Sequence, residues 1–196
     1  MTAPYATAAR PDTGLYNAKL GIWLFLASEA MLFGALFSCY VFLRVGSASW
    51  PHGYEYLNIP LATVNTLVLI ASSMTMVMSW SSATTGEIRA SRRFLGITIL
   101  LGMLFLALKG VEYGTKFREN LFPKVDTFLA IYFTLTAVHA LHVLGGVLVN
   151  AFLWARWRAH WTGSPRQMTN RLEVAGLYWH FVDLVWLFLF PLFYLL

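Results

Sequence analysis

The sequence predicts an all-α integral membrane protein, a five-transmembrane-helix bundle with its N-terminus inside and its C-terminus outside. Three observations predict this fold class. The 196 residues are 58% hydrophobic and only 12% charged, whereas a soluble domain carries about 25% charged residues. Five apolar runs are each long enough to cross a bilayer. Basic residues are shared unevenly between the segments that join these runs.

The five apolar runs give the predicted helices. A spanning helix needs about 20 mostly apolar residues. The runs that meet this requirement are 20–43, 59–80, 94–113, 128–154 and 174–196. Pro, Gly or charged residues bound each run, as expected at the ends of helices. We therefore expect a polar N-terminal segment over residues 1–19 and a single membrane domain over residues 20–196.

Lys and Arg in the short connections predict the orientation, because such residues are enriched in cytoplasmic loops. With the N-terminus inside, the inner segments hold Arg10, Lys19, Arg89, Arg92, Arg93, Arg156, Arg158, Arg166 and Arg171. The outer segments hold only Arg44, Lys116, Arg118 and Lys124. This bias also accounts for the net charge of +5, so no nucleic-acid partner is predicted.

Aromatic residues near the predicted helix ends support the same spans. Trp and Tyr gather at membrane–water interfaces, where their rings sit at the level of the head groups. The residues in such positions are Trp23, Trp50, Trp80, Trp154, Trp157, Trp161, Tyr54, Tyr56, Tyr113 and Tyr194. We expect them to form an aromatic belt.

Several kinds of active site are excluded by residue content. Cys39 is the only cysteine, so an internal disulfide, a CxxC redox motif and a cysteine zinc cluster cannot form. We expect Cys39 to be a small apolar packing residue. The chain also lacks a Gly-rich phosphate loop, a dinucleotide fingerprint and a Ser-His-Asp constellation. No catalytic residue and no metal ligand set is predicted.

Polar residues inside the spans are the candidate functional residues, because a charged group at bilayer depth costs about 2.5 to 3.5 kcal/mol on insertion scales. Counting from the middle of each run at a rise of about 1.5 Å per residue places four of them within about 5 Å of the midplane. These four are Glu29, His139, His142 and Asp183. We expect them to form one polar layer, in which His142 first, or His139 second, holds the Glu29 carboxyl.

Helical spacing predicts which faces carry the polar groups. Residues three or four apart share one face of a helix. One such set in the last run is Glu173, Gly176, His180, Asp183 and Leu187. We expect this face to point inward, with Trp179 and Trp186 pointing elsewhere. In the fourth run His139, His142 and Gly146 share a face, where the small Gly146 allows close helix approach.

The remaining polar residues of the spans have structural interpretations. Lys109 and Glu112 lie three residues apart near the predicted outer end of the third run. We expect them to form an ion pair that snorkels towards the head groups. Asn65, Ser72 and Ser79 of the second run are expected to serve helix packing.

Two functional alternatives use the same residues. In a b-haem anchor subunit, His142 and His180 would face each other across a macrocycle. That reading is weak, because only three histidines lie in the spans and bulky aromatics flank His180. A proton-coupled transporter would use Glu29 and Asp183, but the sequence shows no inverted repeat and no paired broken helices.

Four stretches together resemble subunit III of the haem-copper cytochrome c oxidases. YWHFVDLVWLFLF, with Glu173 before it, resembles the last helix of that family. HALHVLGG resembles its H-x-L-H-x-x-x-G segment, and Ser28-Glu29 resembles the context of its membrane carboxylate. Glu112-Tyr113 resembles a Glu-Tyr pair that closes the preceding helix. The resemblance extends from about residue 15 to the C-terminus and is to the short, five-helix bacterial form.

The resemblance implies a subunit without redox centres in a bacterial plasma membrane. Haem and copper would reside in the partner subunits I and II, in a complex that reduces oxygen and translocates protons. This subunit would stabilise subunit I, bind phospholipid and support proton uptake, and the complex could join a respiratory supercomplex. Glu29 would be the carbodiimide-reactive carboxylate of the family. Because the resemblance is to the five-helix form, we expect the chain to lack the two N-terminal helices that form one wall of a lipid-filled cleft in seven-helix members. We expect lipid head groups to contact basic residues near the inner ends of the helices, and Arg171 is the residue we name for this contact.

Overall fold

The structure, a computed structural model, describes residues 8–51, 53–156 and 165–195, and this part contains helices and no strand. The long helices are α1 (Asn17–Gly46), α3 (Ile59–Thr84), α4 (Ile88–Arg118), α5 (Thr127–Ala155) and α7 (Pro165–Phe190). A single turn, α2 (Gly53–Tyr56), precedes α3, and a π-helical turn, η1 (Pro191–Leu195), continues α7. Arg158, Trp157 and Trp161, for which we predicted membrane-surface positions, lie outside the described residues.

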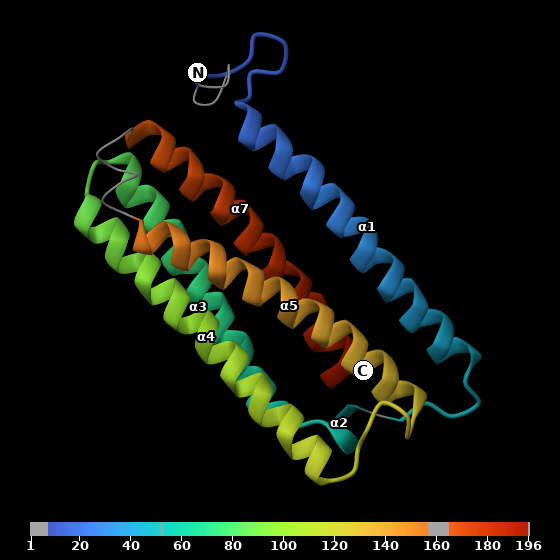
Figure 1. The fold of residues 1–196 in the computed structure, drawn as a ribbon. Coiled ribbons are helices and arrows are strands. Elements are labelled where there is room, and N and C mark those ends of the chain that lie inside the picture. The colour runs from blue at the N-terminus through green and yellow to red at the C-terminus, as the bar shows by residue number, and fades with distance from the viewer. Residues whose placement is uncertain (1–7, 52, 157–164, 196) are drawn as a thin grey trace.

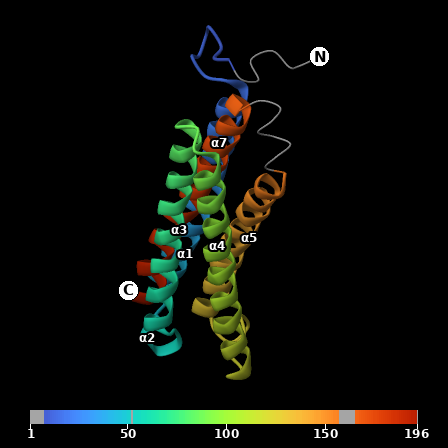
Figure 2. The same ribbon diagram turned by 90° about the vertical axis from the view of Figure 1, so that its left-hand side faces the viewer.

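The five long helices are long and apolar enough to cross a membrane. They run up and down in alternation, so that α1 begins at one end of the bundle and α7 ends at the other (Figure 1). α3 packs most extensively on α4, and α7 packs against α3, α5 and α1. Figure 2 shows α3 beside α4, with α5 slanting away from them towards one end.

Side-chain caps define the starts of two spanning helices. Asn58 accepts a hydrogen bond from the backbone N–H of Leu61 at the start of α3, and Asp126 accepts one from Phe128 at the start of α5. Such caps satisfy N–H groups that have no partner within the helix. Pro60 lies in the first turn of α3, and α7 begins at Pro165, where the missing N–H costs nothing.

The first four predicted runs lie within single helices, and the described part of the fifth, 174–195, lies within α7 and η1, but most helices extend beyond the runs. α4 begins at Ile88 rather than at residue 94, and it ends at Arg118 rather than at residue 113. α7 begins at Pro165 rather than at residue 174. Helical turns outside the apolar core can be polar on one side, so hydropathy alone underestimates their length. In the added turns of α7, for example, Met168 and Leu172 are buried.

The centre of the bundle is built around the indole of Trp179. A Cβ added at Gly102 of α4 or at Gly146 of α5 would lie 2.7 Å from this ring. The Trp179 Nε1 donates a hydrogen bond to Ser72 Oγ of α3, 3.0 Å away. Two glycines, on α4 and α5, and a serine hydroxyl on α3 therefore make room for the Trp179 indole and bind its N–H group.

The predicted orientation of the last helix is wrong in part. Trp179 and Trp186 are buried in the core, whereas Leu187, expected inside, is 45% exposed. Trp186 Nε1 donates to Thr66 Oγ1 of α3 at 2.9 Å. The indole N–H groups find acceptors on α3, so both rings can be buried without an unpaired donor. Gly176 lies where α7 contacts α3. A Cβ added at this position would lie 3.7 Å from the Met76 side chain.

α1 is peripheral to the other four spanning helices. It contacts α7 and, to a smaller extent, α5 (Figure 1). Among the residues of α1, only Phe33 and Tyr40 are fully buried. Cys39, expected to be a packing residue, is exposed in this chain because it lies on an outward face of α1.

Candidate functional site

Glu29 of α1 and His142 of α5 form the expected contact. His142 Nε2 lies 2.9 Å from Glu29 Oε2, and His142 Nδ1 lies 2.8 Å from the carbonyl oxygen of Val138. A carbonyl only accepts, so Nδ1 carries a proton. Either a neutral His142 then accepts a hydrogen bond at Nε2 from a protonated Glu29, or an imidazolium donates one to the Glu29 carboxylate. Both arrangements have zero net charge, which suits a pair at bilayer depth.

Aromatic side chains surround this pair. The ring of Phe33 lies edge-on to the His142 ring at 5.2 Å between centroids. The Tyr178 hydroxyl of α7 donates to the His142 carbonyl oxygen at 3.0 Å. The Glu29 and His142 side chains are 15% and 17% exposed. The pair is therefore a partly accessible link between three helices, α1, α5 and α7.

His139 does not join this layer. Its ring stacks on Trp186 at 5.2 Å and lies edge-on to Phe105 of α4 at 5.7 Å. Neither ring nitrogen has a hydrogen-bond partner within the described residues. Three residues of an α-helix turn through about 300°, which leaves His139 about 60° away from His142. This offset is enough to point one histidine at α1 and the other into the core.

His180 and Asp183 of α7 are also separate from Glu29. His180 Nδ1 lies 2.6 Å from the Ser73 hydroxyl of α3. Asp183 is buried, and neither of its carboxyl oxygens has a hydrogen-bond partner in the part of the chain that the structure describes. The single predicted polar layer is thus divided between the α1–α5 contact, the core around His139 and the α3–α7 contact.

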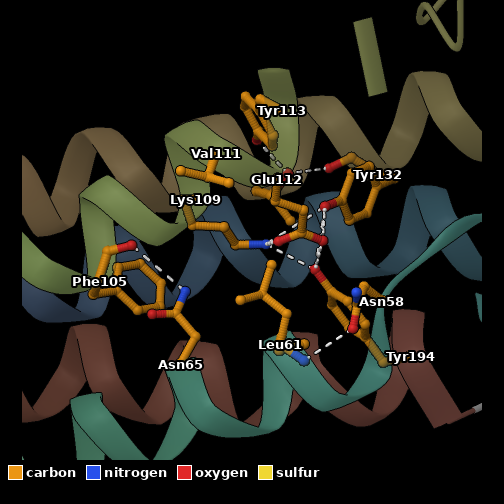
Figure 3. Close-up of polar contacts among 12 residues, drawn as sticks. Asn58, Leu61, Asn65, Phe105, Lys109, Val111, Glu112, Tyr113, Tyr132 and Tyr194 are labelled. Atoms are coloured by element: carbon orange, nitrogen blue, oxygen red, sulfur yellow. Dashed lines mark hydrogen bonds and ion pairs between the residues drawn. The ribbon is translucent and has the colours of Figure 1, made fainter. Parts of the chain in front are cut away.

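Lys109 and Glu112 form a buried cluster with two tyrosines (Figure 3). The Lys109 Nζ lies 2.9 Å from Glu112 Oε2 and donates to the Tyr194 hydroxyl at 2.8 Å. Glu112 Oε1 accepts from Tyr132 at 2.9 Å and from Tyr194 at 2.6 Å. Lys109 Nζ also lies 4.6 Å from the ring centroid of Trp186. α4, α5, α7 and η1 thus all contribute to one polar cluster.

This cluster contradicts the predicted snorkelling pair. The Lys109 and Glu112 side chains are only 5% and 3% exposed. α4 continues for nine residues after Lys109, to Arg118, which is about 13 Å at the rise of an α-helix. Lys109 is therefore too deep to reach the helix end. Tyr194, expected in the aromatic belt, is buried and supplies the hydroxyl that Lys109 needs.

The sequence contained part of the signal for this cluster. The spacing of Lys109 and Glu112 is apparent in the sequence, but Tyr132 lies in an apolar run and Tyr194 has the position of an interfacial residue. Every charged group of the cluster has donors or acceptors from tyrosines, so its geometry is that of a closed structural network.

Glu173 of α7 joins this helix to the start of α1. Its Oε2 accepts from the Tyr16 hydroxyl at 2.9 Å, and its Oε1 lies 2.5 Å from Lys19 Nζ. Burial, and the hydrogen bond to the nearby carboxylate, raise the pKa of the Tyr16 hydroxyl above its usual range. Glu173 therefore fastens the start of α1 rather than contributing to a polar layer in the bundle centre.

Arg171 lies beside a groove between α1, α5 and α7 of about 520 Å³. Ile22 and Phe25 of α1, Gly145 of α5 and Tyr178 of α7 line it as well. No carboxylate among the described residues forms an ion pair with Arg171. The expected head-group contact at Arg171 stays a prediction.

The two histidines considered for haem already have hydrogen-bond partners, and no cluster of metal-ligating side chains is found among the described residues. They contain no group of three or more His, Cys, Asp or Glu side chains placed to hold a metal ion. His142, one of the two histidines considered for haem, is hydrogen-bonded through both ring nitrogens, and His180 is hydrogen-bonded through Nδ1.

The comparison with known families decides between the remaining interpretations. The family described as cytochrome c oxidase subunit III matches residues 11–196. The chain belongs to this family. It is accordingly a non-catalytic subunit III of a haem-copper oxidase, and the haem-anchor and transporter alternatives are not favoured.

Relatives of two oxidase types are similar to this family member. Cytochrome c oxidase subunit 3 of Corynebacterium diphtheriae is 35% identical over 97% of this chain and 92% of the relative. The subunit 3 of the cytochrome bo(3) ubiquinol oxidase of Pseudomonas aeruginosa is 34% identical over 92% of this chain and 85% of the relative. Cytochrome c oxidase subunit 3 of Bacillus sp. (strain PS3) is 33% identical over 92% of this chain and 86% of the relative.

Proposed function

We propose that this subunit III docks on the haem- and copper-bearing subunits I and II of a bacterial plasma-membrane oxidase, stabilises subunit I and supports its proton uptake. The observation that carries the proposal is the Glu29–His142 pair, 2.9 Å apart, which ties the peripheral α1 to α5. Polar contacts between spanning helices hold helices together at about 0.6 to 2 kcal/mol each. Because only 6% of its most apolar window is buried, α1 keeps most of its apolar surface free for a partner or for lipid.

The same pair supports a secondary role in proton uptake. Its proton can shift between Glu29 Oε2 and His142 Nε2 without any change in the net charge of the pair. Such a pair can hold one proton at bilayer depth at low electrostatic cost. His139, His180 and Asp183 form no hydrogen-bonded chain with it among the described residues, so the proposed role is to hold a proton and not to conduct it through the bundle.

The proposed orientation places the N-terminus inside and the C-terminus outside. The starts of α1, α4 and α7 and the end of α5 lie at one end of the bundle (Figure 1). Lys19, Arg89, Arg92, Arg93 and Arg166 belong to this end. Residues 1–19 would then be a polar segment at the inner surface and residues 20–196 one membrane domain. Fusions of alkaline phosphatase to the C-terminus should be active, and inactive fusions would contradict this orientation.

Bound phospholipid is part of the proposal. The groove of Arg171 is apolar along Ile22, Phe25 and Tyr178 and has a cation at its inner end. This combination suits an acyl chain below a phosphate group. We also propose that the whole oxidase can associate with other respiratory complexes, because they would lie in the same membrane.

The proposal is tested by gentle detergent purification of the tagged chain, followed by mass spectrometry of its partners and a reduced-minus-oxidised spectrum. We expect co-purification with a large haem-bearing subunit and haem bands in the complex. After dissociation, the isolated chain should show no Soret band. A Soret band that stays with the isolated chain, or recovery of the chain without oxidase subunits, would overturn the proposal.

A further inference from the structure

His180 of α7 and Ser73 of α3 form a polar contact on an otherwise apolar face of the bundle. His180 Nδ1 lies 2.6 Å from the Ser73 hydroxyl oxygen, and both residues are half-buried. Exposed apolar side chains continue this face along both helices at spacings of three and four residues, which keep them on the same side as the contact. We call the whole surface the α3–α7 face, and its residues are Ile70, Ser73, Val77, His180, Leu184 and Leu187.

The polar contact lies at the middle of the spanning helices. His180 is the central residue of the 31-residue helical segment Pro165–Leu195. Ser73 lies about 2 Å from the centre of α3, at the rise of an α-helix. The hydrocarbon core of a bilayer is about 30 Å thick, so lipid head groups would be about 15 Å away from this level. The face is therefore covered here either by lipid chains or by another protein segment.

The Nε2 atom of His180 is a polar atom that points out of this face. It has no hydrogen-bond partner among the described residues, and, unlike the ring nitrogens of His139, it is not buried. The Ser73 hydroxyl is hydrogen-bonded to His180 Nδ1, and neither oxygen of Asp183 accepts a hydrogen bond from a described residue. The hydroxyl therefore donates to Nδ1, which leaves the ring proton on Nε2. The face thus presents an N–H donor at the middle of the membrane.

An N–H donor at this depth needs an acceptor that lipid chains do not supply. A polar group without a partner in hydrocarbon is costly, and ionisable residues of spanning segments almost always face protein, water or one another. A second copy of the chain, related by a twofold axis through His180, would place one N–H donor against another. The face therefore fits a different spanning helix, one that carries a hydrogen-bond acceptor at mid-membrane.

We propose that the α3–α7 face is an interface with a spanning helix of a partner oxidase subunit, in which a side-chain oxygen accepts a hydrogen bond from His180 Nε2. The exposed apolar residues of the face pack against the apolar side chains beside that oxygen. A hydroxyl or amide oxygen matches the donor without bringing a net charge to the middle of the bilayer. The inference rests on the proposed function, which supplies partner subunits in the same membrane.

Photocrosslinking in the membrane-bound oxidase tests which molecule covers the face. The photoreactive residue p-benzoylphenylalanine replaces Leu184, which is exposed one turn away from His180. Leu104 is the matched control position, because it is exposed near the middle of α4, a helix outside the face. We expect the probe at Leu184, but not the probe at Leu104, to crosslink to a subunit that mass spectrometry identifies as part of the purified oxidase. A crosslinked dimer of this chain, or adducts with lipid alone, would overturn the proposal.

Variants of His180 test the hydrogen bond itself. His180→Phe keeps a flat ring without nitrogen and should raise the dissociation constant of this chain from the detergent-solubilised complex about 3- to 30-fold, the range for one hydrogen bond between spanning helices. In His180→Gln the side-chain oxygen can accept from Ser73 while the amide N–H donates outward, so the constant should stay within about twofold of the parent value. Ser73→Ala removes the same bond within the chain but keeps Nε2, so it should have a smaller effect than His180→Phe.

Two results with these variants would contradict the interface. Binding of the His180→Phe chain as tight as that of the parent would show that His180 makes no hydrogen bond to a partner. Equal weakening by Ser73→Ala and His180→Phe would assign His180 to packing within this chain. A parent complex that purifies without any partner subunit would instead contradict the proposed function, so the two failures are distinguishable.

Discussion

α1 and the other four spanning helices differ in how they are held. Only 6% of the most apolar window of α1 is buried inside the structure, against 28% to 50% for the other four. The four helices share Trp179, Trp186 and the closed cluster of Lys109 and Glu112. α1 is fastened by separate polar contacts, at Glu29 with His142 and at Glu173 with Tyr16 and Lys19.

This difference shows that polar groups serve two purposes in one membrane bundle. In the four-helix core, Lys109 and Glu112 are surrounded by protein, and the loss of either leaves an unpaired partner that cannot reach water. At α1 the polar contacts lie at an interface that is partly open, so their loss releases one helix. Changes in the core should therefore unfold the chain, and changes at α1 should free α1 only.

The largest effect is expected from Glu112→Ala. This change leaves the Lys109 ammonium buried without its carboxylate, which costs about 3 to 5 kcal/mol in a buried pair. The thermal unfolding midpoint and the yield of folded chain in detergent should both fall. The double variant Lys109→Met with Glu112→Leu should recover most of the loss, because a buried ion pair replaced by apolar groups is often neutral.

Glu119→Ala is the matched control for that variant. Glu119 is the residue that follows α4; it is 51% exposed, and its carboxylate lies 3.5 Å from the Lys116 ammonium. Its loss should cost less than about 1 kcal/mol. If Glu112→Ala unfolds at the same temperature as Glu119→Ala, the cluster does not stabilise the core.

A medium effect is expected from Gly146→Ala. The added Cβ would lie 2.7 Å from Trp179, and overpacking of this kind costs about 1 to 3 kcal/mol. At neighbouring Gly145 the nearest atom to an added Cβ is the Tyr178 hydroxyl oxygen at 3.5 Å, an ordinary contact. Gly145→Ala should be neutral or slightly stabilising, because Ala favours the helix. Equal unfolding midpoints for the two variants would contradict the tight packing around Trp179.

The smallest effect is expected from Glu29→Ala. It removes one interhelical contact, of about 0.6 to 2 kcal/mol, and should leave the unfolding of the four-helix core unchanged. The distribution of distances between spin labels on α1 and α5 should become broader. Ser28→Ala is the control, because among the described residues the Ser28 hydroxyl donates to the Phe25 carbonyl of its own helix and to no other helix. A drop in core stability as large as that of Glu112→Ala would remove the distinction between the two regions.

The sequence predicts the spans well and the environments less well. Apolar runs of 20 or more residues leave little choice of structure in a bilayer, which explains why each of the five lies in a helix. Depth counting also predicts the contact of Glu29 with His142, because the two residues lie at equal depth. It fails for His139, since depth says nothing about the direction in which a side chain points.

The cluster of Lys109 could not be predicted from hydropathy. The Lys109 ammonium donates to the hydroxyl groups of Tyr132 and Tyr194. A hydropathy pattern treats both residues as aromatic residues of the core or of the membrane interface. Tyr194 also depends on η1, where the helix widens at Pro191. A π-helical turn changes the angular position of every residue after it, so a regular helical count misplaces Tyr194.

The place of Tyr194 has a consequence for biosynthesis. Lys109 enters the membrane with α4, before the later segments α7 and η1 bring Tyr194 to it. Glu112 is then already present one turn away in the same helix, so the two charges can neutralise each other without help from later segments. The tyrosine hydroxyls arrive with α5 and η1. Insertion of α7 and η1 is therefore the step that completes the network.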